Sequence, residues 1–150
     1  MVGDIKITSR YGDGDYLSKN KDWHVEGSPW KASQIHKIIQ RNNLKVQTKG
    51  YNDYVSEADQ ESEKIIISAL QKAYPSYKVT AEESGSNAIE SEYEWFIDPI
   101  DGTANYFRGL DECCVSIALM DGNEALIGVI YNFNNNQMYT AIKDHGAFLN

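Results

Sequence analysis

The sequence predicts an α+β domain in which two helices precede an antiparallel sheet. Two segments in the first half, 29–44 and 56–73, repeat apolar residues at near-helical spacing. From residue 79 the pattern changes to short apolar runs divided by polar turns, which is typical of strands. Because the helical segments come first and do not alternate with the strands, the order favours an α+β layer arrangement.

The first half contains a polar lead-in and two helices. Residues 1–29 are rich in glycine and aspartate and have no sustained period, so we expect a poorly ordered amino-terminal segment. The domain itself is expected over residues 30–150. Its first helix can open at Pro29 and end near the Asn42-Asn43 pair.

The second helix has the better signals. Ser56 is expected as its N-cap, with Asp59 three residues later as in a capping box, and the helix should end before Pro75. Its apolar face is predicted from residues that recur at helical spacing: Ala58, Ser62, Ile65, Ala69, Leu70 and Ala73.

Strands are expected at residues 79–82, 93–98, 113–120, 125–132 and 137–142, and another begins at 147. Polar turns at 121–122 and 134–136 separate the later runs, which predicts an antiparallel meander. Helices on one face alone would leave the other face of this sheet to be covered.

Composition restricts the partners and the compartment. The net charge of −8 argues against nucleic acid and anionic membrane surfaces as non-specific partners. No apolar run approaches the ~20 residues of a membrane span, and the first ten residues lack the layout of a signal peptide. Cys113 and Cys114 are adjacent in an apolar run, which favours reduced core residues of a cytoplasmic protein, with a reactive thiol as the alternative.

The densest chemistry lies in residues 95–110, WFIDPIDGTANYFRGL. Asp98 and Asp101 are three residues apart at the end of an apolar run. Two acidic side chains this close in the sequence are usually separated by solvent or bound to a cation. Gly102 and Thr103 follow in a turn that can present backbone N–H groups to an anion. The stretch therefore indicates a combined site for metal and phosphate.

Two earlier segments, KGYNDYVSEAD (49–59) and AEES (81–84), complete a recognisable set. Together with residues 95–110 they resemble the motifs of the inositol monophosphatase family of magnesium-dependent phosphomonoesterases, within the fructose-1,6-bisphosphatase-like fold. The resemblance runs from about residue 45 to residue 150. It implies the amino-terminal half of a layered α-β-α-β-α fold. The family's second half, with its W-D-x-A-A-G motif and a further metal-binding aspartate, is absent from this sequence.

Carried over residue by residue, the resemblance implies a magnesium site. Glu82, Asp98 and Asp101 would be ligands of catalytic Mg²⁺, of which the complete family site holds two or three ions. The backbone carbonyl of Ile100 would be a further ligand. Hard oxygen donors of this kind are what Mg²⁺ prefers.

The resemblance also assigns the remaining roles. Asp101, Gly102 and Thr103 would bind the substrate phosphate. Thr103, oriented by Asp59, would act with the ligand Glu82 to activate the attacking water. Three residues could contact these groups without binding the metal or the substrate themselves: Lys49, Glu83 and Asn105.

The implied reaction is Mg²⁺-dependent hydrolysis of a small phosphate monoester such as inositol 1-phosphate, with a 3′-phosphonucleotide as the second substrate class. The alternative is a weak or inactive fragment that acts as a binding or dimerising module. A homo-oligomer or a complementing half would then cover the sheet. Residues 15–44 weakly resemble the start of a bacterial methyltransferase, but no glycine-rich cofactor loop follows them and no methyl transfer is expected.

Overall fold

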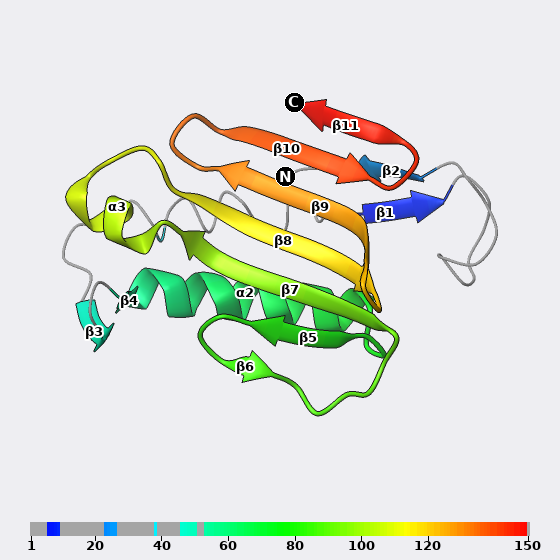
Figure 1. Ribbon diagram of the computed structural model, residues 1–150, viewed down its shortest axis with the longest axis horizontal. Coiled ribbons are helices and arrows are strands. Elements are labelled where there is room, and N and C mark those ends of the chain that lie inside the picture. Colours follow the sequence, from blue (N-terminus) through cyan, green and yellow to red (C-terminus); the bar gives the residue numbers. More distant parts are fainter. Residues whose placement is uncertain (1–5, 10–22, 27–37, 39–45, 51–52, 150) are drawn as a thin grey trace.

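The computed structural model describes residues 6–9, 23–26, 38, 46–50 and 53–149 (Figure 1), with side chains for Ile38 and from Ser56 onward. In chain order the elements are β1 (Lys6–Ser9), β2 (Trp23–Glu26), β3 (Val46–Gly50), β4 (Asp53–Ser56), α2 (Glu57–Ala73), β5 (Lys78–Ala81), β6 (Gly85–Ser86), β7 (Tyr93–Asp101), α3 (Thr103–Arg108), β8 (Cys114–Asp121), β9 (Glu124–Asn132), β10 (Gln137–Ile142) and β11 (Gly146–Leu149).

Within the described residues the main sheet has seven strands in the order β11-β10-β9-β8-β7-β5-β6. The five strands from β7 to β11 pair antiparallel in sequence order, which confirms the predicted meander. The pairing of β5 with β7 is parallel, so the sheet is mixed and not purely antiparallel. The reason is that β6 turns back along β5 and residues 87–92 return the chain, so that β7 starts at the same end as β5.

Helix α2 lies across one face of this sheet (Figure 1) and begins and ends where the sequence predicts. Ser56 and Asp59 form the predicted capping box, and the helix stops before Pro75. The predicted apolar face was partly wrong, because Ile66 is buried whereas Ile65 is half-buried and Ala73 is exposed. Periodicity alone does not select among three consecutive isoleucines, and the buried stripe also includes acids that accept hydrogen bonds.

Two predictions fall mainly outside the described residues. Of the first helix, 29–44, the structure describes Ile38, which is helical and buried in the core. Of the amino-terminal segment 1–29 it describes β1 and β2, which pair antiparallel. None of the described helices is long and apolar enough to cross a membrane.

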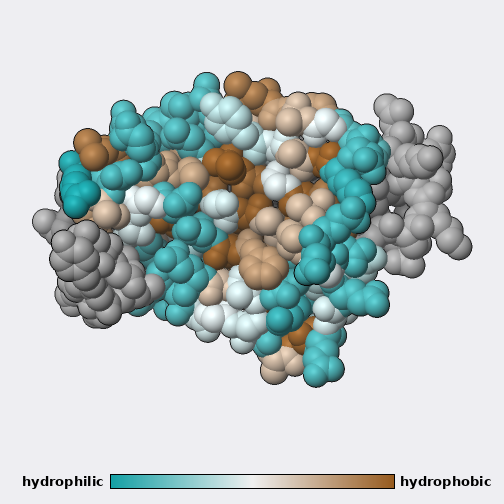
Figure 2. Space-filling view, in the orientation of Figure 1, coloured by the Kyte–Doolittle hydropathy of each residue, from teal (hydrophilic) through white to brown (hydrophobic). Residues whose placement is uncertain are grey.

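The two faces of the sheet differ in burial. The face toward α2 carries the core, in which Trp95 packs with alternate residues of β8 and β9. We call the opposite face, which includes Phe96, Ile130 and Tyr139, the outer face. These three side chains are 42%, 45% and 43% exposed. Ile130 and Tyr139, together with Ala118 and Gly128, line a shallow hollow of about 470 Å³. Figure 2 shows apolar groups gathered over these middle strands.

Candidate metal and phosphate site

A bulge in β7 places both aspartates of the motif on one face of the sheet. Asp98 pairs with Ser116 and Asp101 with Cys114, so a step of three residues along β7 matches a step of two along β8. In a regular strand, side chains three residues apart point to opposite faces. The extra residue therefore brings Asp101 to the outer face, beside Asp98. The bulge contains buried Pro99, which cannot donate to a strand ladder.

Parallel pairing of β5 with β7 brings Glu82 to the same place. Ala81, the last residue of β5, lies opposite Ile97, and the N–H of Glu82 donates to the Ile97 carbonyl at 3.0 Å. Glu82 thus begins a turn next to Asp98, with its own side chain exposed. The structure thus places Glu82 and Asp101 each close enough to Asp98 to act on its charge.

The carboxyl group of Asp98 is in an unfavourable position for a negative charge. Burial, then the charge of Glu82, a hydrogen bond with Glu82 and the charge of Asp101 raise the pKa of Asp98 to about 7, while the Ile100 N–H acts in the opposite direction. Its Oδ1 is buried and has no hydrogen-bond partner among the described residues. A bound cation would provide the missing positive partner and favour the charged form.

Thr103 connects this carboxylate cluster to α2. Its Oγ1 lies 3.2 Å from Asp59 Oδ1 and 2.9 Å from the Ile100 carbonyl oxygen, and its single proton can be donated fully to only one of them. Asp59 is fully buried, and its Oδ2 accepts hydrogen bonds from the N–H and hydroxyl of Ser56 at 2.8 and 2.5 Å. One carboxylate therefore caps α2 with one oxygen and contacts the loop after β7 with the other.

Gly102 is required by the close approach of the chain. Its φ is +87°, and an added Cβ would lie 2.7 Å from the Glu112 carbonyl oxygen. The Gly102 carbonyl accepts the N–H groups of Asn105 and Tyr106 as α3 begins. The N–H groups before these, in the first turn, have no carbonyl partner within a helix. This geometry is compatible with the predicted phosphate contact of Gly102 and Thr103.

Two asparagine side chains hold the neighbouring loop in place. Asn105 Nδ2 donates to the Glu112 carbonyl at 2.8 Å, so its amide supports the loop and does not point its nitrogen at an ion. Asn134 Nδ2 donates to the Asp111 carbonyl at 2.9 Å. The sequence did not mark Asn134, because a run of three asparagines indicates a turn whatever that turn contacts.

The other marked residues are less directly involved. Lys49 lies in β3, but its side chain is outside the described residues. Glu83 is half-buried, and its N–H donates to Glu63 of α2.

The two cysteines next to the site are not activated. Burial, then the charges of Asp101 and Asp98, raise the pKa of the Cys114 thiol to about 11. Burial also raises the pKa of the Cys113 thiol, which argues against the reactive-thiol alternative.

The donors at the site fit Mg²⁺ but do not enclose an ion. Within the described part of the chain, no three His, Cys, Asp or Glu side chains are grouped so that they could hold a metal ion. Carboxylates and one carbonyl are nevertheless the ligand types that Mg²⁺ takes, and it commonly keeps waters and shares phosphate oxygens. The unpartnered Oδ1 of Asp98 is the observation that favours a cation at this position.

Comparison with known proteins identifies the family of the chain. The sequence model of the inositol monophosphatase family matches residues 25–150 of this chain. The match includes most of residues 15–44, the segment that also resembles the start of a methyltransferase. The putative Nus factor SuhB of Neisseria meningitidis serogroup A is 42% identical over 108 residues, which cover 71% of this chain and 41% of that protein. Inositol-1-monophosphatase of Mesorhizobium japonicum is 43% identical over 109 residues, which cover 72% of this chain and 41% of that protein.

Solved structures give the same result. The extragenic suppressor protein SuhB of Bartonella henselae superposes with a TM-score of 0.74 at 40% identity, covering 81% of this chain and 48% of the other. An IMPase/NADP phosphatase complexed with Mg²⁺ and phosphate has a TM-score of 0.69 at 28% identity, with 79% and 45% covered. The chain thus spans less than half the length of these relatives. The chain belongs to the inositol monophosphatase family.

Proposed function

We propose that this chain supplies the amino-terminal half of a Mg²⁺-dependent phosphomonoesterase site whose substrate is a small phosphate monoester such as inositol 1-phosphate. The observation that carries the proposal is Asp98. Its buried Oδ1 is unpartnered, Glu82 and Asp101 lie beside it, and Thr103 follows in the same loop. A relative of 28% identity, with 45% of its length covered, is described as complexed with Mg²⁺ and phosphate.

The ions would be held by Glu82, Asp98, Asp101 and the carbonyl of Ile100. When bound, Mg²⁺ supplies charge neutralisation for the phosphoryl group and lowers the pKa of water. The N–H groups of Gly102 and Thr103 would orient the phosphate, and the acids would exclude it unless cations are present, because like charges repel.

The hydroxyl of Thr103 has a defined part in this proposal. In the structure its proton is shared between Asp59 and the Ile100 carbonyl. If Ile100 instead faces an ion, Thr103 would donate to Asp59 alone, which leaves a lone pair of Oγ1 available to accept a hydrogen bond from the attacking water. The water's proton could then pass to Oγ1 as the Thr103 proton passes to Asp59. Buried Asp59 would keep this orientation because Ser56 fixes its other oxygen.

Phosphate release from inositol 1-phosphate tests the proposal. We expect Mg²⁺-dependent turnover in the presence of the family's second half, and its loss in Asp98→Asn. Asp121→Asn is the matched control, because Asp121 ends the same β7–β8 ladder opposite Tyr93, far along the strands from Asp98. Calorimetry with Mn²⁺ tests the half-site alone. Absence of binding to the intact chain would overturn the metal assignment, and equal turnover by Asp98→Asn would overturn the mechanism.

A second candidate function is association, which the exposed outer face favours. We infer that this face receives the part of the family fold lying outside the matched region, because the chain spans 41% of the length of its curated relatives. Phe96, Ile130 and Tyr139 are large and exposed, and isolated proteins rarely leave such groups together in water. One relative is named a putative Nus factor. The two free cysteines fit a reducing compartment such as the cytoplasm.

The association can be tested by complementation. The part of the Mesorhizobium japonicum enzyme outside the matched residues, produced separately, should form a one-to-one complex in sedimentation. Ile130→Glu should prevent the complex, whereas Ala125→Glu, at the exposed start of the same strand, should not. A homodimer disrupted by Ile130→Glu would show instead that a second copy covers the face. If the chain is a stable monomer and does not bind the added half, the inference is overturned.

A further inference from the structure

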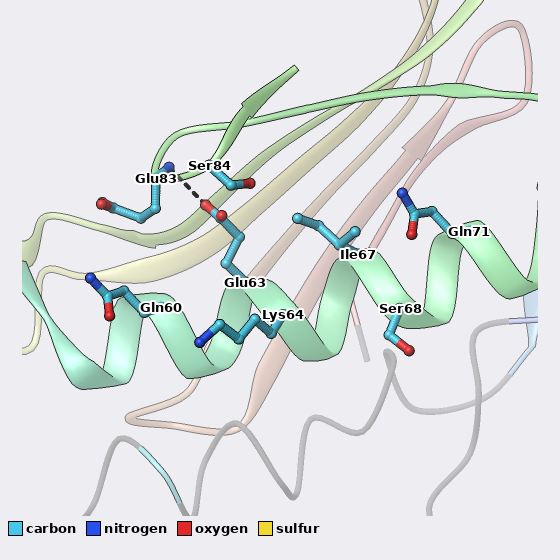
Figure 3. A pocket seen from close by; sticks show the side chains of 8 residues that line it. All are labelled: Gln60, Glu63, Lys64, Ile67, Ser68, Gln71, Glu83 and Ser84. Carbon is cyan, nitrogen blue, oxygen red and sulfur yellow. Dashed lines mark hydrogen bonds between the residues drawn. The ribbon is translucent and has the colours of Figure 1, made fainter. Parts of the chain in front are cut away.

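Glu63 is a buried acid that the motifs did not mark. It lies within α2 and is 3% exposed, although glutamate is almost never fully buried without a partner. Its Oε2 accepts the backbone N–H of Glu83 at 2.8 Å. Figure 3 shows the Glu63 side chain extending from the helix toward the turn, with this hydrogen bond drawn between them.

The turn that Glu63 contacts is the one that presents Glu82. On one side, the Glu82 N–H is fixed to the Ile97 carbonyl of β7 at 3.0 Å. On the other side, the N–H of the next residue, Glu83, donates to Oε2 of Glu63 in α2. Two successive amides are therefore anchored to two different elements, while the Glu82 side chain between them remains exposed. Anchoring of this kind reduces the entropy that a ligand residue loses when an ion binds.

We propose that Glu63 is a positioning residue that holds Glu82 where it can coordinate a cation. The inference rests on the proposed function, because it assumes that Glu82 is a metal ligand. A carboxylate acceptor makes a stronger hydrogen bond to an amide than a neutral one. Its removal would leave the Glu83 N–H without this partner and release one side of the turn.

Mn²⁺ affinity, measured by calorimetry on the chain, is the main readout. Glu63→Met keeps the length of the unbranched side chain but removes the carboxylate, and we expect it to weaken Mn²⁺ binding about tenfold. Glu63→Gln retains an oxygen acceptor and should stay within about threefold of the native affinity. Glu57→Ala removes one negative charge from the first turn of the same helix and controls for charge alone.

Amide hydrogen exchange at Glu83 provides a readout that does not depend on the metal. The Glu83 N–H should exchange faster in Glu63→Met than in the native chain and in Glu63→Gln, while N–H groups in the middle of β8 stay unchanged. If Glu63→Met does not fold, Glu63→Leu replaces it in both measurements.

The outcomes separate this inference from the proposed function. If the native chain and Glu57→Ala bind no Mn²⁺, the proposed metal site fails, and exchange at Glu83 alone cannot rescue the inference. If the native chain binds Mn²⁺ and Glu63→Met binds it equally well, the metal site stands and the positioning role is overturned. Equal weakening in Glu63→Gln, Glu63→Met and Glu57→Ala would assign the effect to charge and also overturn it.

Discussion

Replacing Asp98 with asparagine should stabilise the metal-free protein at pH 8 and abolish its metal binding. The carboxyl group has a pKa of about 7 in the folded chain, against an ordinary value of 3.8, chiefly because it is buried and lies beside Glu82. Asparagine has nearly the same shape and cannot ionise, so the substitution removes an unfavourable charge. Stability and function are thus expected to change in opposite directions at this position.

The sign and the size follow from proton linkage. A raised pKa means that the folded chain binds the proton more tightly than the unfolded chain. The stability from this group is therefore complete below about pH 4 and is lost as the pH rises toward 7. A difference between 3.8 and about 7 corresponds to at most about 4 kcal/mol. Because Asp98 is only half-buried, solvent screening reduces the expected effect to about 1–2 kcal/mol.

Urea unfolding in the presence of EDTA measures this effect directly. At pH 8 the free energy of unfolding of Asp98→Asn should exceed that of the native chain by about 1–2 kcal/mol, and the gain should be smaller at pH 5. Asp121→Asn, at the exposed far end of the ladder, should show neither the gain nor its pH dependence. Addition of Mn²⁺ at pH 8 should stabilise the native chain but not Asp98→Asn. A less stable Asp98→Asn at pH 8, or an equal gain at both pH values, would refute the reasoning.

Three further predictions concern the loop and the outer face. Gly102→Ala should lower the free energy of unfolding by about 2–3 kcal/mol in urea titration, because its φ is positive and the new Cβ would meet the Glu112 carbonyl; an unchanged midpoint would contradict this. Thr103→Val should remove phosphate release by the complemented chain while Thr103→Ser retains it, because only serine keeps the hydroxyl that contacts Asp59. The isolated chain should self-associate or unfold easily because Ile130 and its neighbours are exposed; sedimentation and thermal melting that show a stable monomer at all concentrations would argue against it.

Local signals in the sequence were sufficient for most elements. The helix from Glu57 to Ala73 was predictable because Ser56 and Asp59 form a cap that depends only on residues three apart. The strands from β8 to β11 were predictable because their apolar runs are separated by short polar turns, which favour antiparallel pairing of neighbours. Their boundaries agree with the predicted ones within a few residues.

The features that assemble the site depend on contacts that no local pattern specifies. The parallel pairing of β5 with β7 joins segments separated by an irregular return loop, so the position of Glu82 beside Asp98 follows from topology and not from spacing. The bulge at Pro99 changes the face of Asp101, although strand alternation predicts the opposite face. Glu63 was not selected from the sequence, because its partner, the Glu83 amide, lies twenty residues away.

The candidate site and the outer face are parts of one surface. Phe96 and Asp98 flank buried Ile97 on β7, so both side chains lie on the outer face, and Ser116 stands opposite Asp98. A partner that packs on Phe96 also excludes water near Asp98, where a lower dielectric strengthens the attraction between a carboxylate and a cation. Covering the face and binding the metal should therefore be positively coupled, and linkage requires the coupling to be reciprocal. Mn²⁺ should raise the affinity of the complementing half by the same factor by which that half raises the affinity for Mn²⁺. Equal affinities with and without the ion would show that the two surfaces act independently.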